Sequence, residues 1–267
     1  MFRIEAPDGD RLVGAVVQDV TAKRRLEQER ADALESLREA DRRKDEFIAV
    51  LAHELRNPLA PVGTAAQILA IAGEDEPTAA KMAPIIERQV RHMARLLEDL
   101  LDVSRVLTGK LEVRLEPCDL GALAAQVADD HREPFQREGT TLHVEASPVQ
   151  VLGDAVRLTQ AISNLLHNAN KFAAGGKVQL ATWIDEAAGE AVLRVQDDGP
   201  GIPDELQPLL FQPFAQGPQD AARSKGGLGL GLALTRTIAE LHGGRIAAVN
   251  VEGGGARFEL RLPLLRG

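Results

Sequence analysis

The chain has 267 residues, of which 44% are hydrophobic and 27% charged, and its formal net charge is -9 at pH 7. This length and composition are typical of one or two globular domains with enough apolar material to bury a core in each. The acidic balance argues against a nucleic-acid-binding protein, because a phosphate-contacting surface is normally rich in clustered Lys and Arg. Cys118 is the single cysteine, so no intramolecular disulfide can form, and we interpret it as a small buried hydrophobe.

No segment combines the length and the apolarity of a membrane-spanning helix. The most apolar stretch of the first half, residues 59–72, is interrupted by proline and polar residues and falls short of the roughly 18 to 20 apolar residues that such a helix needs. The N-terminus lacks the basic start and the apolar region of a signal peptide. We therefore expect a cytoplasmic chain, which could be the inner portion of a longer receptor.

The first elements in chain order are a short strand and a charged helix. Residues 11–20 are rich in β-branched side chains and predict one strand, too little for a domain, so we expect residues 1–21 to be the end of a sensor domain. Apolar or alanine residues then recur every seven positions, which predicts a coiled-coil helix over residues 22–44, although Arg30 and Lys44 interrupt the seam. The recurring residues are Leu26, Ala33, Ala40 and Phe47.

Two long amphipathic helices follow, separated by a helix stop at residues 73–77. The first continues to about Ala72. The second carries apolar residues in alternating steps of four and three, at Met82, Ile86, Gln89, Met93, Leu96, Leu100 and Val103. Because each stripe has little else to cover it, the simplest arrangement pairs two antiparallel hairpins as a four-helix bundle. We therefore expect a homodimer formed through residues 45–108.

After Gly109 the sequence pattern changes to one of alternating strands and helices, which predicts an α/β sandwich over residues 109–267. The predicted strands are residues 111–115, 141–146, 177–184, 191–196, 245–249 and 256–262. The predicted helices lie near residues 119–132, 154–172 and 229–242. Residues 204–226 show little periodicity and predict a long mobile loop of the kind that forms lids.

One histidine of the first long helix is expected to face solvent. The apolar stripe around it runs through Ile48, Leu51, Leu55, Leu59, Val62 and Ala66. At about 100° per residue His53 falls almost opposite this stripe, where a neutral imidazole is an available nucleophile near pH 7. Asn57 lies one turn on and shares its face, whereas Glu54 points elsewhere. A stray surface histidine is the alternative reading of His53 considered alone.

Two prolines lie inside the same helix, just past the histidine. Pro58 removes a backbone donor and crowds the carbonyl of Glu54, and Pro61 repeats this effect one turn later. They predict a kink or a loosened helix that could act as a hinge.

The predicted helix at residues 158–172 borders its apolar stripe with Asn164, Asn168 and Lys171. Two amides and an ammonium can supply oxygen coordination to Mg²⁺ and a counter-charge to phosphates. Ordinary surface polarity is the alternative. The stripe itself is expected to bury Leu158, Ile162, Leu165, Ala169 and Phe172.

Two glycine-containing segments follow. Residues 195–203, VQDDGPGIP, place two carboxylates before a tight turn in which a ligand can approach the backbone. Glycines 226, 227, 229 and 231 directly precede an amphipathic helix, so that free amides and the helix N-terminus form an anion site. The pattern is neither a Walker A loop nor a dinucleotide fingerprint.

The segment HELRNPL, residues 53–59, resembles the H-box of sensor histidine kinases, and residues 88–105 are similar to the second dimerisation helix of that family. The resemblance implies that His53 is phosphorylated on a ring nitrogen, that Glu54 acts as base and that Asn57 assists phosphatase activity. GAVVQDVT, residues 14–21, resembles the end of a PAS sensor domain.

The later segments, in this order, resemble the N, G1, F and G2 boxes of the family's ATP-binding domain, whose Bergerat-type fold is shared with gyrase and Hsp90. The resemblance implies that Asn168 binds Mg²⁺, that Asn164 and Lys171 contact phosphates, and that Asp197 reads the adenine amino group. It implies further nucleotide contacts from Phe172, Gly199, Gly201, Ile202, Phe211, Phe214, Gly227, Leu228, Gly229, Leu230 and Gly231. Two positions depart from the usual pattern, since Asp198 stands where Asn is common and Leu228 replaces a small polar residue.

The implied function is ATP-dependent autophosphorylation of His53, followed by transfer of the phosphoryl group to an aspartate of a response-regulator receiver domain in two-component signalling. ATP and Mg²⁺ are the implied cofactors, and a second copy and a receiver domain the implied partners. A nucleotide-binding scaffold without turnover is a first alternative, and the residues that count against it are the intact His53, Asn168, Lys171 and Asp197. A gyrase- or Hsp90-type ATPase is a second, but it leaves the histidine-bearing hairpin unexplained. A kinase whose phosphatase activity dominates is a third.

Overall fold

The computed structural model describes residues 2–5, 11–14, 21–73, 75–107, 110–215 and 229–265. The chain separates into two compact units, residues 1–49 and residues 50–267. The first contains an antiparallel pair of short strands, β1 (Phe2–Glu5) and β2 (Arg11–Gly14), and the beginning of helix α1 (Thr21–Ala72). Strand β1 was not predicted, and residues 15–20 of the predicted strand lie outside the described residues.

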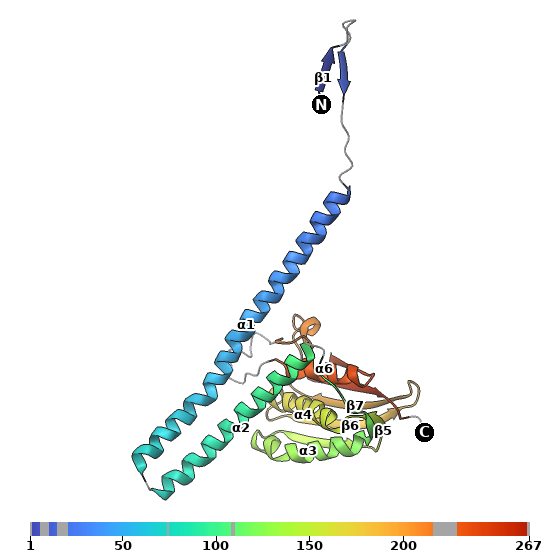
Figure 1. Cartoon of the computed structure of the whole chain (residues 1–267). Helices are drawn as coiled ribbons and strands as arrows, with labels where there is room; N and C mark the ends of the chain where they lie inside the picture. The colour runs from blue at the N-terminus through green and yellow to red at the C-terminus, as the bar shows by residue number, and fades with distance from the viewer. Residues whose placement is uncertain are drawn as a thin grey trace. The chain divides into compact units, whose positions relative to one another are not determined.

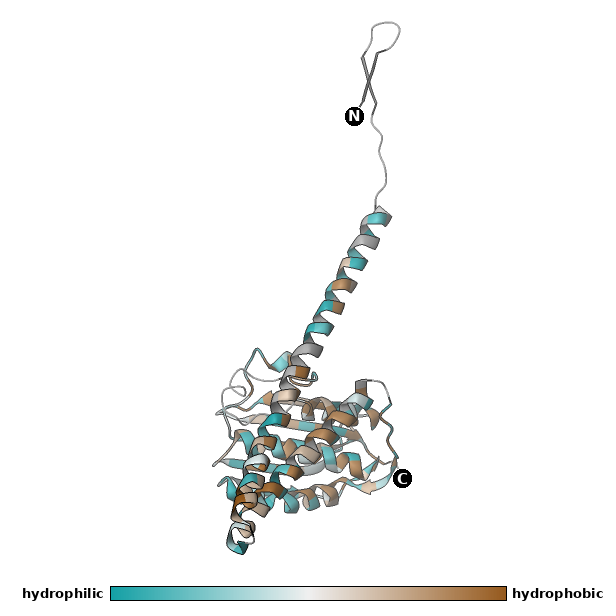
Figure 2. Cartoon of the chain, turned by 60° about the vertical axis from the view of Figure 1, so that its left-hand side comes forward, coloured by the Kyte–Doolittle hydropathy of each residue, from teal (hydrophilic) through white to brown (hydrophobic). Residues whose placement is uncertain are grey.

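The N-terminal half of α1 is largely hydrophilic where it is described (Figure 2). Ala33 of the predicted seam is exposed, and the side chains of the other three seam residues are not among those described. The coiled coil therefore stays a prediction.

The second unit begins with a helical hairpin. Its first helix ends, and its second begins, close to the predicted helix stop at residues 73–77. Helix α1 ends at Ala72, where Gly73 adopts a positive φ of 62° and its N–H donates to the carbonyl of Leu69 at 3.1 Å. Helix α2 (Glu76–Leu107) follows, with the carboxylate of Asp75 accepting from the N–H of Thr78 at 3.2 Å. Helix α1 continues through both of its prolines, so the loosening predicted there does not interrupt it.

The apolar stripes of the hairpin are covered to different extents. On α2 the described stripe residues are buried or half-buried, with Leu96 only 5% exposed. On α1 the predicted stripe is divided, because Leu51, Leu55 and Val62 are half-buried. Its other members, Ile48, Leu59 and Ala66, are exposed. A single partner helix covers only one flank of a stripe of this width, which explains the difference. Exposed apolar residues remain on both helices, including Leu59, Ile68, Ile71, Val90, Leu97 and Leu101.

The rest of the second unit is an α/β sandwich, as predicted. Its central sheet has the strand order β4-β6-β7-β9-β8, in which β4 and β6 are parallel and the other neighbours antiparallel. The elements, in chain order, are β3 (Glu116–Asp119), α3 (Leu120–Arg137), β4 (Thr141–Ala146), β5 (Gln150–Gly153), α4 (Ala155–Phe172), β6 (Lys177–Asp185), β7 (Glu190–Asp197), the 3-10 turn η1 (Gln207–Leu209), α6 (Gly231–Leu241), β8 (Arg245–Asn250) and β9 (Ala256–Pro263).

Helices α3, α4 and α6 form one layer against one face of this sheet (Figure 1). The core lies between the two layers, where α4 and the strands contribute the fully buried Leu158, Ile162, Leu180, Leu193 and Leu260. Burial of these side chains is the main stabilising contribution to the sandwich. The opposite face of the sheet carries the polar and charged members of the alternating strands.

Three predictions about this domain need correction. Residues 111–115 do not form a strand, because Leu111 packs into the core and the N–H of Arg114 donates to the carboxylate of Asp154 at 3.0 Å and not to a neighbouring strand. The strand comes later, as β3, and pairs with β5, which was not predicted. Cys118 on β3 is half-buried and not fully buried, and burial raises the pKa of its thiol.

The predicted lid segment, residues 204–226, is partly outside the described residues. Up to Ala215 it consists of turns and η1. Within the second unit, α2 also contacts the sandwich, since the carboxylate of Asp102 accepts from Arg157 at 2.7 Å and from Gln160 at 2.8 Å, both on α4. None of the described helices is long and apolar enough to cross a membrane.

Candidate functional site

Helix α4 is fixed at its start by a cap that also bonds to two other parts of the sandwich, the segment at Arg114 and His242. Oδ1 of Asp154 accepts from the N–H groups of Val156 at 3.0 Å and Arg157 at 3.2 Å. The N–H of Asp154 donates to Nε2 of His242, which follows α6, at 2.8 Å. Burial opposes ionisation of Asp154, but the backbone N–H donors, with that of Arg114 foremost, outweigh it and lower the pKa of this carboxyl. The cap fixes the rotation of α4 and thereby the direction of its polar flank.

The three polar residues predicted along α4 do share a half-buried flank of the helix. Asn164, Asn168 and Lys171 are all partly exposed. The side-chain amide of Asn164 donates to the carbonyl of Gly231 at 3.3 Å, so the middle of α4 adjoins the first residue of α6. A Cβ at Gly231 would lie 3.4 Å from Cγ of Asn164, an ordinary contact.

Phe172 is predicted to be buried, and this prediction is wrong, because its side chain is 44% exposed. It is the last residue of α4, and at this end the apolar face of the helix extends beyond the core. Its ring instead supports Lys171, whose Nζ lies 4.5 Å from the ring centroid. The exposed ring and the ammonium therefore form one surface at the end of α4.

Asp197 ends β7 and opens a turn, residues 197–202, that we call the aspartate turn. It is only 6% exposed, and its Oδ1 accepts from the N–H of Gly199 at 2.9 Å and of Ala256 at 3.2 Å. Its other oxygen, Oδ2, accepts no hydrogen bond from the described residues. Burial raises the pKa of Asp197, and the neighbouring charge of Asp198 adds to this effect against the two N–H donors. The carboxylate is thus held through Oδ1, and its Oδ2 can accept a hydrogen bond from a ligand.

Glycines in the aspartate turn allow close approach of the backbone to other groups. A Cβ at Gly199 would lie 2.9 Å from the carbonyl oxygen of Phe172, which brings the turn against the end of α4. Gly201 has a positive φ of 78°, a conformation that L side chains rarely adopt. The structure therefore brings Phe172 of the α4 motif together with Asp197, Gly199 and Gly201 of the later glycine-containing motif.

Asp198, which replaces the usual Asn, fastens the end of β7 to the start of β6. Its Oδ1 accepts from the N–H of Lys177 at 2.8 Å, and its own N–H donates to the carbonyl of Lys177 at 3.2 Å. A Cβ at Gly176 would lie 2.1 Å from this carboxylate, so a larger residue there would displace the Asp198 side chain. The bond at this position needs only a side-chain oxygen as acceptor, which Asp198 supplies as an asparagine would.

The sequence analysis missed residues of the turn between β8 and β9, residues 251–255. Gly255 packs so closely that a Cβ there would lie 1.9 Å from the carbonyl oxygen of Asp197. Asn250 precedes the turn and Ala256 follows it, and both bond to the aspartate turn. The run of three glycines at 253–255 was the available signal, because three positive φ values cluster there.

The F-box and G2 residues meet where the described chain resumes after residue 228. The N–H of Phe214 donates to the carbonyl of Gly229 at 3.0 Å, and Phe214 itself has a φ of 68°, unusual for a bulky residue. Gly229 has a φ of 66° and fits against Ala215. Leu230 is 2% exposed and packs with Leu96, Leu51 and Phe214, so it is a core residue of this corner, while Phe211 packs against the main core. Gly227 and Leu228 lie outside the described residues.

The candidate acceptor lies on α1. The side chains of His53 and Glu54 are not among those described, so the solvent-facing orientation of His53 stays a prediction. Asn57 is exposed.

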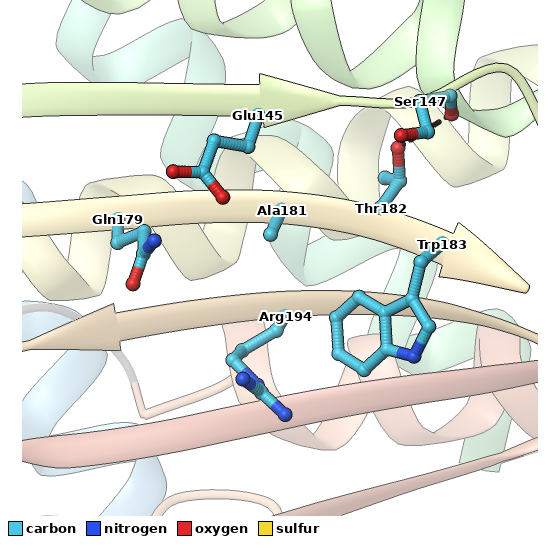
Figure 3. Close-up of a pocket in the computed structure, with 7 residues that line it drawn as sticks. All are labelled: Glu145, Ser147, Gln179, Ala181, Thr182, Trp183 and Arg194. Carbon is cyan, nitrogen blue, oxygen red and sulfur yellow. Dashed lines mark hydrogen bonds between the residues drawn. The ribbon is translucent and has the colours of Figure 1, made fainter. Parts of the chain in front are cut away.

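A shallow hollow of about 430 Å³ lies on the sheet face away from the helices, between side chains of β4, β6 and β7 (Figure 3). The guanidinium of Arg194 lies 4.5 Å from the ring centroid of Trp183 and bonds to Glu259 at 2.8 Å. None of the predicted site residues lines this hollow.

The fold and site together define the class of protein: a histidine-bearing helical hairpin followed by an ATPase-type sandwich. Residues 153–266 match the family described as histidine kinase-, DNA gyrase B- and HSP90-like ATPase. Residues 43–109 match the His Kinase A (phospho-acceptor) domain. The chain belongs to the sensor histidine kinase family.

Individual relatives agree with this assignment. The circadian input-output histidine kinase CikA of Synechococcus elongatus is 36% identical over 252 residues, which cover 88% of this chain and 32% of CikA. The probable sensor histidine kinase TcrY of Mycobacterium tuberculosis is 33% identical over 219 residues, 82% of this chain and 46% of TcrY. The chain thus spans less than half the length of these curated relatives.

Solved structures give the same result. The mycobacterial sensor histidine kinase MprB matches with 30% identity and a TM-score of 0.51, covering 57% of this chain and 100% of that one. Full-length ShkA in complex with AMPPNP matches with 27% identity and a TM-score of 0.61, covering 83% of this chain and 46% of that one. The hairpin and sandwich predicted from the sequence are therefore confirmed.

Proposed function

We propose that the chain uses ATP to phosphorylate its own His53 and then transfers the phosphoryl group to an aspartate of a response-regulator receiver domain. The observation that carries this proposal is the combination of two sites in one chain. A half-engaged buried carboxylate, Asp197, opens a turn that packs against the end of α4 at Phe172, and the phospho-acceptor motif HELRNPL precedes both on α1.

Adenine recognition falls to the aspartate turn in this proposal. Oδ2 of Asp197 accepts a hydrogen bond from the exocyclic amino group of the base, while Gly199 and Gly201 leave room beneath the ring. Ile202, buried to 8% exposure, and the exposed ring of Phe172 supply apolar contact. A buried carboxylate that accepts from an amino group discriminates strongly against a base that presents a carbonyl there.

The phosphates extend along α4 toward the start of α6 in this proposal. Asn164 and Lys171 contact phosphate oxygens, and the glycines Gly227, Gly229 and Gly231, with Leu228 and Leu230 between them, wrap the chain of phosphates. The adjacency of Asn164 and Gly231 supports this assignment, since it joins the polar flank to a helix N-terminus. Phe211 and Phe214 belong to the lid over the nucleotide.

Mg²⁺ fits the donor set of this flank. The ion prefers oxygen ligands and is usually held by one or two protein groups together with substrate phosphates. The amide oxygen of half-buried Asn168 is such a ligand, and Lys171 lies three residues further on. When bound, Mg²⁺ supplies neutralisation of the phosphate charge.

The chemical step is an in-line displacement that needs positioning more than covalent help from the protein. A ring nitrogen of His53 forms a bond to the γ-phosphorus while the bond from phosphorus to the bridging oxygen breaks, and ADP leaves. Glu54 accepts the proton from the other ring nitrogen. In the separate phosphatase reaction, Asn57 orients a water that attacks the phosphorus of the receiver's aspartyl phosphate, and inorganic phosphate leaves.

We further propose a homodimer that buries the exposed apolar residues of α1 and α2 in a four-helix bundle. The chain then divides into the end of a PAS-like sensor (1–21), a signalling helix (22–44), the dimerisation and phospho-acceptor domain (45–108) and the ATP-binding domain (109–267).

The test is a two-stage labelling experiment. The purified chain is incubated with γ-labelled ATP and Mg²⁺, and a receiver domain is then added. We expect acid-labile, base-stable label on the chain that moves to the receiver. Nucleotide binding without any label would instead support the scaffold alternative, and continuous release of phosphate without a labelled chain would support an ATPase.

A further inference from the structure

Asn250, at the end of β8, makes two hydrogen bonds to the aspartate turn. Its Oδ1 accepts from the N–H of Ile202 at 2.6 Å, and its Nδ2 donates to the carbonyl of the same residue at 2.8 Å. The side-chain amide thus satisfies both backbone groups of Ile202, as a neighbouring β-strand would. These two bonds fix the backbone position of a residue 48 positions away in sequence.

The same contact fixes Gly201. A Cβ at Gly201 would lie 2.9 Å from Oδ1 of Asn250, so the glycine backbone rests directly against the amide. At the other end of the aspartate turn, the N–H of Ala256 holds Asp197. Asn250 and Ala256 flank the β8–β9 turn. The two residues therefore hydrogen-bond to the last and the first residue of the aspartate turn, Ile202 and Asp197.

Asn250 lies at a place where its contribution to overall stability is limited. It is an exposed residue at the end of β8, an edge strand of the sheet, and it belongs to no part of the apolar core. If its amide is removed, water can reach the backbone groups of Ile202 and satisfy them. What is lost is the fixed position of the turn.

We propose that Asn250 is a positioning residue for nucleotide recognition, which holds Gly201 and Ile202 so that the base meets Oδ2 of Asp197 in register. This inference rests on the proposed adenine site. Hydrogen-bond recognition depends steeply on distance and angle, so a turn that is free to shift weakens the bond between the base and Asp197. The loss affects ATP more than GTP, because guanine presents a carbonyl where adenine presents its amino group.

The experiment measures dissociation constants for ATP and GTP by calorimetry in the full chain and in its Asn250→Ala, Asn250→Asp and Thr182→Val variants. Thr182 is the control, because its hydroxyl donates to the carbonyl of Ser147 at 2.8 Å in a buried position away from the aspartate turn. Asn250→Asp keeps the acceptor for the N–H of Ile202 and loses the donor to its carbonyl. Unfolding in urea is followed for every variant.

We expect Asn250→Ala to weaken ATP binding about tenfold and to reduce the preference for ATP over GTP, with Asn250→Asp between it and the wild type. The KM for ATP should rise with little change in kcat. Thr182→Val should lose stability and keep its ATP affinity. If Asn250→Ala does not fold, Asn250→Asp decides by the same criteria.

Two results separate failure of the inference from failure of the site. Wild-type ATP affinity and base preference in both Asn250 variants would overturn the inference, provided that Asp197→Asn loses ATP binding. If Asp197→Asn binds ATP normally, the proposed adenine site is wrong, and the role of Asn250 falls with it.

Discussion

Asp197 combines burial, a partly engaged carboxylate and a raised pKa, a combination that costs folding stability and that a ligand can use. We predict that Asp197→Asn weakens ATP binding at least about 100-fold, because an amide NH₂ in place of Oδ2 faces the amino group of adenine. The oxygen of the new amide still accepts from Gly199 and Ala256. Calorimetry with ATP measures the loss.

The same substitution should not destabilise the chain without nucleotide. Asp197→Asn removes a buried charge and keeps the two hydrogen bonds, so the free energy of unfolding in urea at pH 7 should stay equal or rise. Loss of ATP binding together with a large loss of stability would mean that Asp197 is a structural residue, and the functional reading would then be wrong.

The raised pKa of Asp197 predicts a pH dependence of definite sign. Because the folded state binds the proton more tightly than the unfolded chain, stability decreases as the pH rises from the ordinary aspartate value through the raised one. The penalty is fully present above the folded-state pKa and is relieved as the pH falls through it. We therefore predict that the stability difference between the wild type and Asp197→Asn shrinks from neutral to acid pH. A difference that is constant with pH would contradict the burial argument.

At the scale of elements, the cap of α4 is the feature that orients the polar flank. Asp154→Ala removes an acceptor of three backbone N–H groups, from Arg114, Val156 and Arg157. We predict a loss of about 1 to 3 kcal/mol in the free energy of unfolding at pH 7, measured in urea. Asp129→Ala is the matched control, since the Asp129 carboxylate is 66% exposed and pairs with Arg132 one turn on along α3, and it should cost little.

The contribution of Asp154 should also depend on pH. The folded state lowers its pKa, so its stabilisation is present above the unfolded-state value and is lost as the pH falls through the lowered value. The wild type and Asp154→Ala should therefore approach each other in stability at acid pH, and a gap that persists there would show that packing and not the charge of the cap is responsible.

The sequence predicted those elements whose periodicity is complete over their own length. Strand β4 and helix α4 have nearly the predicted bounds, because alternation and the 3.6-residue stripe run from end to end. Strands β3 and β5 have four residues each, too few for a period, and they are specified by pairing with each other across more than thirty residues. The predicted strand at 111–115 had the alternation but no neighbour to pair with.

The site shows the same limit. Motif residues such as Asp197 and Asn168 were identified because each motif is local. Asn250 and Ala256 were missed because their contacts join positions 48 and 59 residues apart, and nothing in the local sequence distinguishes an asparagine at a strand end that binds a distant backbone.

At the scale of the whole molecule, the exposed apolar residues of the hairpin predict association between copies. Leu97 and Leu101 on α2 are 49% and 59% exposed. We predict that Leu97→Glu raises the dissociation constant of the dimer by at least about 100-fold, because a charge cannot be buried unpaired in the bundle. Light scattering measures the mass as a function of concentration.

Val156→Glu is the matched control for this experiment. Val156 is 76% exposed on α4 of the sandwich and belongs to neither helix of the hairpin, so its substitution should leave the mass unchanged. A wild-type chain that is monomeric at all concentrations, or a Leu97→Glu variant that stays dimeric, would contradict the four-helix bundle.

The central claim is that His53 is the acceptor of the phosphoryl group of ATP, and labelling of the wild type beside His53→Gln tests it most directly. Both proteins are incubated with γ-labelled ATP and Mg²⁺ after calorimetry has established equal ATP affinity. The account predicts acid-labile, base-stable label on the wild type and none on the variant. Equal label on His53→Gln would contradict it, because the phosphoryl group would then reside on another residue.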